Sequence, residues 1–465
     1  MNTPANQITQ VSQIQWLDSF KQSIGLATSK GPDALDLVRQ RAGKALASEP
    51  VPFRKMERWR YTPVDGLFKL PLNIVKSAPA NDRDFSDFFT LGLDSYRFII
   101  ADGKATFLGD VNNLPAGVTL TSMHTARQQQ PELLSRYAGK IMNHEGADNG
   151  FQTSGSKKDS RLFQHLNQSA LTDGIFIHIP EGVKLEKPVE VLFVKTGDEA
   201  DLIQTHNVIV LENKAEMTLI ENHASEKASD SFSNNQFEID LQNQSRMKHY
   251  FLQNQHTSNW FRQGIHRTQS SESHYQGWFG CCGSHWSRLE LNAFFTGENA
   301  VSDIKGIQLG MDGQVNDIHM DIRHDLPHCQ SEQHFRGLVS NKSKIVFDGN
   351  ITVSKDAQKT VAHLSDNNLM LTRNTEVDAK PQLEIYADDV QCSHGTSIGE
   401  LDEQQVFYLR SRGIDENHAR SLLSLGFVAE LIENIELEEF RQHMLDLLDQ
   451  QLRASQRVET VNGSN

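Results

Sequence analysis

The chain has 465 residues, of which 23% are charged and 37% hydrophobic, with a formal net charge of −15 and a mean hydropathy of −0.50. Such a composition is typical of a globular protein of two or three domains, and its acidity argues against a general nucleic-acid partner because phosphates repel it. Its apolar runs are shorter than the roughly 20 residues of a membrane helix, and its first residues lack a secretory pattern, so we expect a cytoplasmic protein.

The first part of the chain predicts helices and a mixed region. Residues 11–48 have apolar side chains near helical spacing. Residues 62–170 are mixed, with a strand expected over Tyr96–Ala101 and a helical stretch near 131–142. We therefore predict an N-terminal helical and mixed domain over residues 1–170.

From residue 171 to residue 399 the sequence predicts a β domain. Alternation of apolar and polar residues with period two recurs in short segments, at 175–179, 189–194, 207–212, 216–221, 237–242, 288–295, 344–353 and 383–387. Small polar turns recur between them, for example Asn213-Lys214-Ala215, Asn243-Gln244-Ser245 and Glu298-Asn299-Ala300. A β-sandwich and a β-solenoid both accommodate many short strands, and the recurring turn favours a solenoid whose strands stack coil on coil.

After residue 399 the period becomes helical. Asp402 and Asp415 are suited to cap two helices, which Gly413 and Gly426 are expected to end. A third helix is expected over residues 428–454. This gives a C-terminal helical domain and a disordered tail, with predicted bounds of 400–455 and 456–465.

The four cysteines do not form a disulfide framework. Cys281 and Cys282 are adjacent, and neither Cys329 nor Cys392 completes a Cys-x-x-Cys pair. Neighbouring residues on a strand point to opposite faces, so Cys281 and Cys282 are expected to be small buried residues. A reducing compartment fits this pattern, and the spacing alone predicts no closed zinc or iron–sulfur site within one chain.

Two further segments resemble functional motifs only in part. Residues 150–157 are glycine-rich, but Lys157 does not follow the second glycine directly, so we expect no ATP site on this chain. Histidines are dense between residues 319 and 334, where a metal site is one possibility, with Cys329 its most plausible member. Polar strand faces and turns are the alternative explanation, because the spacing matches no tetrahedral pattern.

The Cys392-Ser393-His394 segment has the spacing of two ligands. If it is a strand, the Cys392 thiol and the His394 imidazole project from the same face. Both groups bind iron, and mixtures of Cys and His ligands occur in iron–sulfur centres. Two ligands are too few for a cluster, so the others would come from another chain, from bound thiols or from solvent. On spacing alone, a buried cysteine beside a surface histidine is the favoured explanation of the segment.

Three segments carry a family resemblance. Residues 373–414, RNTEVDAKPQLEIYADDVQCSHGTSIGELDEQQVFYLRSRGI, are similar to the C-terminal signature of the SufB/SufD family of iron–sulfur cluster assembly proteins. Residues 341–360 and 52–64 also resemble that family, so the likeness extends from about residue 50 to 435. The CSHG segment and the absence of cysteines before Cys281 favour the SufD branch over the SufB branch.

The resemblance implies a fold and partners. The implied fold is mainly β, with a right-handed parallel β-helix core flanked by N-terminal and C-terminal helical domains. The implied role is a non-catalytic scaffold subunit of a SufB–SufC–SufD complex, in which SufC is the ATPase that binds ATP. SufC docking would use Tyr408, Arg410, Arg412 and Gly413.

The resemblance also implies the site residues. A transient iron–sulfur cluster or iron would bind His394, with Cys392 beside it, at the interface with SufB, and the chain would support iron acquisition. The isolated chain would pair as a homodimer through exposed strand edges. Two other functions stay open: a β-helix carbohydrate-active enzyme, and a stand-alone metal-binding protein that uses the 319–334 segment.

Overall fold

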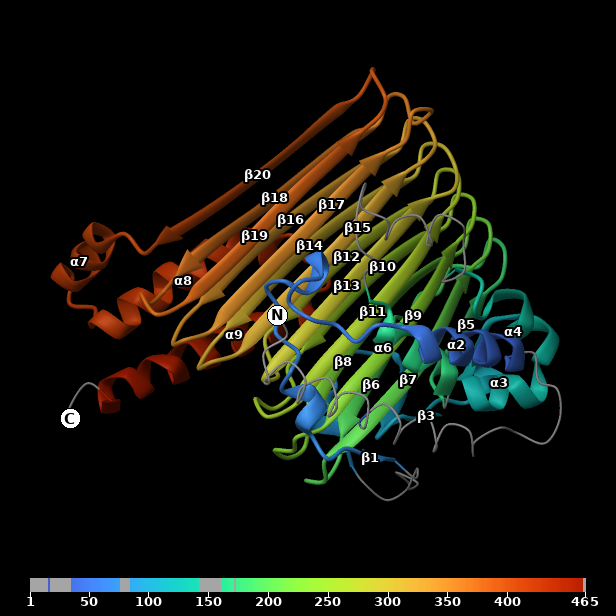
Figure 1. The fold of residues 1–465 in the computed structure, drawn as a ribbon, viewed down its shortest axis with the longest axis horizontal. Helices are drawn as coiled ribbons and strands as arrows, with labels where there is room; N and C mark the ends of the chain where they lie inside the picture. The colour runs from blue at the N-terminus through green and yellow to red at the C-terminus, as the bar shows by residue number, and fades with distance from the viewer. Residues whose placement is uncertain (1–15, 17–34, 76–83, 142–159, 171–172, 463–465) are drawn as a thin grey trace, which may run out of the picture.

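The computed structural model describes residues 16, 35–75, 84–141, 160–170 and 173–462. Two long sheets dominate it, each of ten strands in the described residues (Figure 1). The strands of sheet A are β1 (Asn73–Ile74), β4 (Thr119–Ser122), β5 (Ile175–Ile179), β7 (Asp201–Leu211), β9 (Phe232–Leu241), β11 (Trp260–Gln269), β13 (Trp286–Phe295), β15 (Val315–His324), β17 (Lys344–Val353) and β19 (Glu376–Ile385). The strands of sheet B are β2 (Tyr96–Ala101), β3 (Lys104–Phe107), β6 (Val189–Lys195), β8 (Glu216–Ser225), β10 (Arg246–Gln253), β12 (His274–Cys281), β14 (Val301–Gly310), β16 (Gln330–Val339), β18 (Val361–Met370) and β20 (Gln391–Glu400).

From β5 onward the chain alternates between the sheets, and from β7 onward each strand pairs in parallel with the strand two positions earlier. The result is a parallel β-helix in which each coil contributes one strand to each sheet. The predicted fold class is therefore confirmed, and the sandwich alternative is wrong. The strands of the β-helix run from Ile175 to Glu400, close to the predicted limits of 171 and 399.

A column of turns holds successive coils in register. One residue in each of these turns has a positive φ angle, and its amide donates to a carbonyl of the turn in the next coil. These residues are Lys214, Gln244, Glu272, Asn299, His328 and Lys359. The recurring turn that the sequence indicates therefore marks the coil boundaries, because each turn satisfies the backbone groups of the one below it.

The core lies between the two sheets. Alternate residues of every strand point inward, and sheet A residues such as Phe237 and Phe347 meet sheet B residues such as Phe251 and Phe335. We call this cluster the interior core. Each fully buried phenylalanine contributes about 1.5–3 kcal/mol relative to an exposed one, so the stacked rings favour this register over any slip by one residue.

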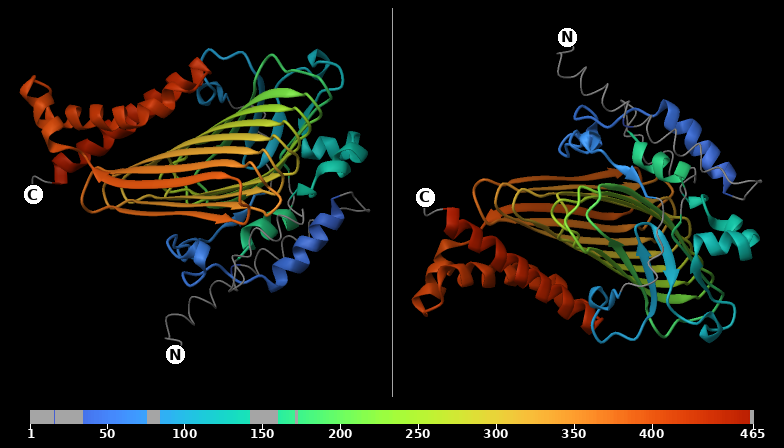
Figure 2. Two further views of the ribbon diagram at one scale, coloured as in Figure 1. Left: turned by 90° about the horizontal axis from the view of Figure 1, so that it is seen from above. Right: turned by 90° about the horizontal axis from the view of Figure 1, so that it is seen from below.

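Helices cover the outer faces of the sheets (Figure 2). They are α2 (Asp36–Ser48), α3 (Met123–Gln129), α4 (Pro131–Tyr137), α6 (Leu162–Ala170), α7 (Glu403–Ser411), α8 (Glu416–Glu433) and α9 (Glu438–Asn462), with the short 3-10 helices η1 (Glu57–Trp59), η2 (Leu67–Lys69), η3 (Ser86–Phe88) and η4 (Val111–Asn113). Apolar residues of α8 and α9 pack on sheet B at Tyr250 and Trp278. Apolar residues of η1, η2 and α6 pack on sheet A at Phe232 and Trp286.

The helical predictions are confirmed in part. The Asp402 and Asp415 side chains accept hydrogen bonds from the Gln404 and His418 amides, as expected of N-caps. The prediction that Gly426 ends a helix is wrong, because α8 continues through it to Glu433. Val428, Leu431 and Ile432 of α8 pack on sheet B, and this burial outweighs the low helix propensity of one glycine.

Other predicted elements have different bounds in the structure. Helix α9 extends to Asn462, beyond the predicted domain limit at residue 455. Most of the helix expected over 11–48 and the whole glycine-rich segment 150–157 lie outside the described residues. In the part of the chain that the structure describes, no helix is long and apolar enough to cross a membrane.

Candidate metal site at the open end of the β-helix

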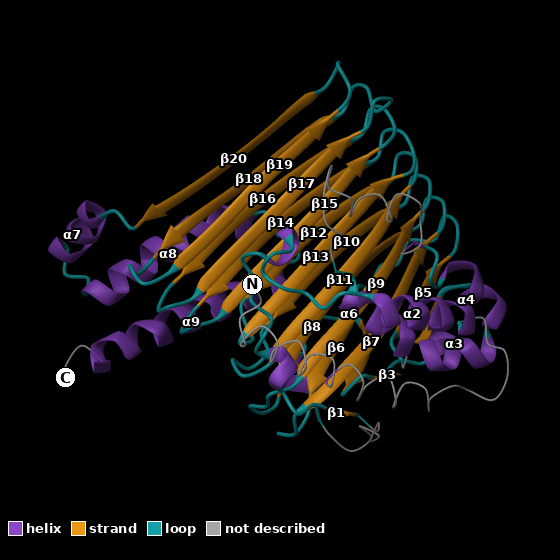
Figure 3. Cartoon of the chain, viewed as in Figure 1, coloured by secondary structure: helices purple, strands orange, loops and turns teal. Residues whose placement is uncertain are grey.

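The last coil leaves two strand edges unpaired. Among the described residues, β19 pairs only with β17 and β20 pairs only with β18, so both strands end their sheets (Figure 3). The Gln391 amide donates to the Thr360 carbonyl, and in a parallel ladder every second residue faces the same neighbour. The backbone amides and carbonyls of Cys392, His394 and the alternate residues after them therefore face away from β18. A strand edge of this kind invites pairing with another chain.

Cys392 and His394 lie on the same face of β20, as the sequence predicts. In the β18–β20 register they stand opposite Ala362 and Leu364, which belong to the interior core. Both side chains therefore point toward the space between the sheets, at the end where no further coil covers it. Cys392 is half-buried against the interior core, and His394 is exposed.

The Cys392 thiol and the His394 imidazole are suited to a metal site whose other ligands come from outside this chain. Burial raises the pKa of the Cys392 thiol. A backbone hydrogen bond involving Ala362 lowers this pKa, but the effect is smaller than that of burial. Metal binding must therefore displace a proton from the thiol. Within the described residues, no three His, Cys, Asp or Glu side chains are arranged to hold a metal ion, so Cys392 and His394 together supply at most half of a four-ligand set.

A buried carboxyl lies one coil below the pair, and the sequence analysis missed it. Asp366 of β18 stands opposite Thr396 of β20 and is fully buried. One of its oxygens accepts a hydrogen bond of 2.7 Å from the Asn368 amide, and the other has no hydrogen-bond partner among the described residues. Burial raises the pKa of Asp366 to about 7, and the Asn368 hydrogen bond offsets only part of this rise. No local pattern distinguishes Asp366 from an exposed strand aspartate.

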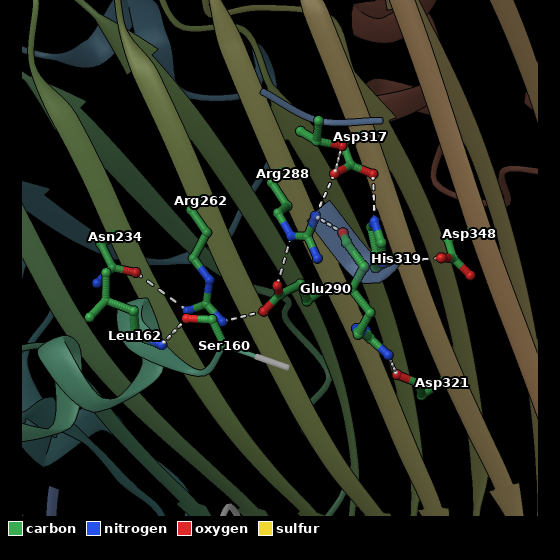
Figure 4. Close-up of polar contacts among 12 residues, drawn as sticks. Ser160, Leu162, Asn234, Arg262, Arg288, Glu290, Asp317, His319, Asp321 and Asp348 are labelled. Atoms are coloured by element: carbon green, nitrogen blue, oxygen red, sulfur yellow. Dashed lines mark hydrogen bonds and ion pairs between the residues drawn. The ribbon is translucent and has the colours of Figure 1, made fainter. Parts of the chain in front are cut away.

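His319 belongs to a buried ionic network on the outer face of sheet A (Figure 4). Its Nε2 atom lies 3.0 Å from an Asp317 oxygen, and its Nδ1 atom lies 3.8 Å from Asp348. Arg288 bridges Asp317 and Glu290 with distances of 2.7 and 2.8 Å. Burial alone would raise the pKa of Asp317, but His319 and Arg288 outweigh it, and the pKa lies below its ordinary value. These contacts favour a structural role for His319.

The other members of the 319–334 segment lie apart. His324 stacks on Phe295 with 4.4 Å between ring centroids, and burial lowers its pKa to about 3. His328 is an exposed turn residue, and His334 is half-buried on β16, 3.8 Å from Glu332. The structure therefore does not bring these histidines together.

Three cysteines are buried in apolar surroundings. The Cys329 thiol donates to the Gly297 carbonyl at 3.2 Å, and burial raises its pKa to about 11. Cys281 faces the interior core, whereas Cys282 faces the helices on sheet B, so the adjacent pair splits between two faces as predicted. Burial also raises the pKa of Cys282, to about 12. Thiols of this kind are weak nucleophiles and weak ligands.

Helix α7 and the first part of α8 project beyond the β-helix, whereas the end of α8 packs on sheet B (Figure 1). Tyr408 and Arg410 lie on α7, Arg412 and Gly413 follow it, and Gly413 has a φ of +90°, which favours glycine. Tyr408 is 56% exposed, and the Arg412 guanidinium lies 5.3 Å from the centroid of the Tyr408 ring. Phe407, which the sequence analysis did not single out, is 71% exposed on the same helix. Large exposed apolar side chains of this kind mark interaction surfaces.

Comparisons with known proteins give the family. The SufBD core domain of the SUF iron–sulfur cluster assembly system matches residues 193–427, and the SufBD N-terminal region matches residues 10–191. The chain is 29% identical to the iron–sulfur cluster assembly protein SufD of Escherichia coli, over 94% of this chain and 96% of that protein. It is 27% identical to a SufBD family protein of Synechocystis, over 88% and 90% of the two chains. It is 26% identical to the chloroplastic protein ABCI7 of Arabidopsis thaliana, over 92% of this chain and 88% of that protein.

These matches agree with the observed architecture, since the core domain falls on the β-helix and continues into α7 and α8. They also span nearly the whole of each chain, so the likeness is not confined to one motif. The chain belongs to the SufBD family of iron–sulfur cluster assembly proteins and is a homologue of SufD.

Proposed function

We propose that this chain is a non-catalytic scaffold subunit of a SufB–SufC–SufD complex, and that it presents His394 and Cys392 to a nascent iron–sulfur cluster or to iron. The observation that carries the proposal is the open end of the β-helix, where both donors face an uncovered interior. The site is incomplete by itself, so a SufB subunit that covers this end would supply the remaining ligands. A site that shares its ligands between two subunits can also release its cargo when the subunits separate.

Apolar side chains around the donors support coverage by a protein partner. Ile385, Tyr386 and Ile398 are exposed beside the site, although residues of this size are usually buried. Pro381 lies on β19, where the missing amide faces the free edge of the strand and does not break the ladder with β17. The same surface suits a second copy of the chain, which agrees with the expected homodimer of the isolated protein.

The α7–α8 surface is the proposed contact for the SufC ATPase. Phe407, Tyr408 and Leu422 are exposed there, and the Arg410 guanidinium lies 3.1 Å from Glu416. In this scheme ATP binding joins two SufC subunits, and their approach moves α7 relative to the β-helix. The movement depends on a difference between the contacts of SufC in its two states, because a ligand shifts only equilibria that it distinguishes.

Substitution of His394 with Ala tests the metal site. In the reconstituted SufB–SufC–SufD complex, we expect His394→Ala to lower the cluster yield by about tenfold, because the cluster loses an interfacial ligand. Iron and sulfide quantification with the visible absorption spectrum measures the yield. His256→Ala is a suitable control, since His256 lies on an exposed turn away from the open end. An unchanged yield in the His394 variant would remove this residue from the site.

Substitution of Phe407 with Ser tests the ATPase contact. Removing an exposed aromatic anchor from an interface costs about 2 kcal/mol, which corresponds to a Kd roughly 30-fold higher for SufC. Calorimetric titration with SufC measures this change. Phe53→Ser, which alters another exposed phenylalanine far along the chain, should leave the affinity unchanged. Equal affinity of both variants would move the SufC contact elsewhere.

A further inference from the structure

The two strands of the last coil are held by different contacts. On the outer face of β19, the Lys344 ammonium of β17 lies 2.8 Å from Glu376 and 2.6 Å from Asp378. Lys344 is 15% exposed and Asp378 is 23% exposed, so water screens this ion pair less than a surface pair, whereas Glu376 is 62% exposed. Further along β19, the Gln382 amide donates to Asp348 of β17 at 3.2 Å. Charged and polar contacts to the preceding coil therefore follow most of β19.

The segment of residues 57–62, which we call the strap, adds a second attachment to β19. It begins with Glu57, whose carboxylate lies 2.5 Å from the Lys380 ammonium of β19. It ends with Thr62, whose hydroxyl donates to Asp317 of β15 at 2.6 Å. Between them, the Tyr61 ring lies 5.6 Å from the Lys344 ammonium. The strap thus joins the N-terminal region to three successive coils on the outer face of sheet A.

β20 has no comparable attachment. The Ser393 hydroxyl lies 2.7 Å from His363, and the Ser397 hydroxyl donates to Asn367 at 2.7 Å. Both are neutral hydrogen bonds, and in the described part of the chain no ion pair involves β20. Apart from Cys392, every residue of β20 is exposed, whereas most residues of β19 are half-buried. β20 is therefore the more weakly held strand of the last coil.

β20 also connects directly to the C-terminal helices. Only Leu401 and Asp402 separate its last residue, Glu400, from α7. The Asp402 side chain accepts from the Gln404 amide at 2.8 Å and fixes the start of the helix. A displacement of α7 is therefore transmitted almost directly to β20, because the connection between them is only two residues long.

We propose that Lys344 and Lys380 are positioning residues, which fix β19 to β17 and to the strap so that movement of α7 displaces β20 alone. Because β20 carries Cys392 and His394, such a displacement would change how the two donors meet a ligand or a partner at the open end. The inference rests on the proposed function for the source of the movement, but the unequal attachment of the two strands is a property of this chain alone.

Hydrogen exchange measured by mass spectrometry tests the attachment in the isolated full chain, at a concentration where mass photometry shows a monomer. We expect the amides of 391–400 to exchange about tenfold faster than those of 376–385, because local opening follows the number of stabilising contacts. Lys344→Met should abolish this difference by accelerating β19, and Lys344→Arg should restore it. Lys305→Met is the matched control, since Lys305 of β14 is 16% exposed and lies 2.6 Å from Asp303. Equal exchange of the two strands in the wild-type chain would overturn the proposal.

The same measurement in the complex with SufB and SufC tests the direction of the movement. A non-hydrolysable ATP analogue should change the exchange of 391–400 by about tenfold and that of 376–385 by less than about twofold. In the Lys344→Met complex both segments should change. Equal changes in both segments of the wild-type complex would overturn the proposal. Failure of the complex to form would count against the proposed function. The comparison of β19 and β20 in the isolated chain would still show whether the two strands are held unequally.

Discussion

Replacing Asp366 with Asn is expected to raise the free energy of unfolding at pH 8 by about 4 kcal/mol. The Asp366 carboxyl is fully buried, and burial raises its pKa to about 7. An unfolded aspartate titrates near pH 3.9, so above pH 7 the folded chain must hold a charge that it stabilises poorly. Asn keeps the shape and the hydrogen bond with Asn368 without the charge. Chemical denaturation followed by tryptophan fluorescence measures the difference.

The pH dependence of this effect has a defined sign. Because the folded pKa is raised, the wild-type chain is most stable relative to the variant below about pH 4 and loses this stability as the pH rises toward 7. The gain from Asp366→Asn should therefore be less than half as large at pH 5 as at pH 8. Asp388→Asn, on an exposed turn, serves as the control and should change little at either pH. A gain that does not depend on pH would show that the Asp366 charge is not the cause.

Replacing Glu221 with Ala is expected to lower the free energy of unfolding by about 3–5 kcal/mol at neutral pH. Glu221 of β8 is fully buried inside the β-helix, with its carboxylate 2.6 Å from His223 and 3.0 Å from His249. The Gln263 amide donates to the same carboxylate at 2.7 Å, and the Tyr275 hydroxyl lies 2.9 Å from His249. The substitution leaves buried polar groups without partners, which costs more than the hydrogen bonds contributed.

The acid dependence of stability distinguishes this network from simple packing. Burial by itself raises the pKa of Glu221, but the hydrogen bonds from His223 and His249 outweigh it and lower the pKa to about 2. The stability it contributes is therefore complete above about pH 4.3 and is lost as the pH falls toward 2. Glu216→Ala, at a half-exposed ion pair with Lys184, should cost less than about 1 kcal/mol. An equal loss in both variants would contradict the account of a buried network.

Local patterns in the sequence predicted those parts of the molecule that depend on neighbours along the chain. Period-two alternation predicted the strands, and the recurring turn predicted the stacking of coils. Asp402 and Asp415 were identified as caps because a cap bonds to amides only two or three residues away. The shared face of Cys392 and His394 follows from the same rule, since alternate residues of any strand point to one side.

Where local rules failed, distant packing decided the outcome. Gly426 lies within α8 because the next turn of that helix is buried on sheet B. Nothing in the sequence around His319 indicates that this residue lies close to Asp348, which is 29 positions further along the chain.

What the sequence by itself determined was therefore the fold class, several of the coil boundaries and the shared face of Cys392 and His394. Only the tertiary structure decided that these donors face an uncovered interior, that Asp366 is buried beneath them, and that Lys344 holds one strand of the last coil and not the other. The physical reason is the register between coils. Contacts across the sheets join residues roughly 30 positions apart, and their partners are set by the summed lengths of strands and turns rather than by any local pattern.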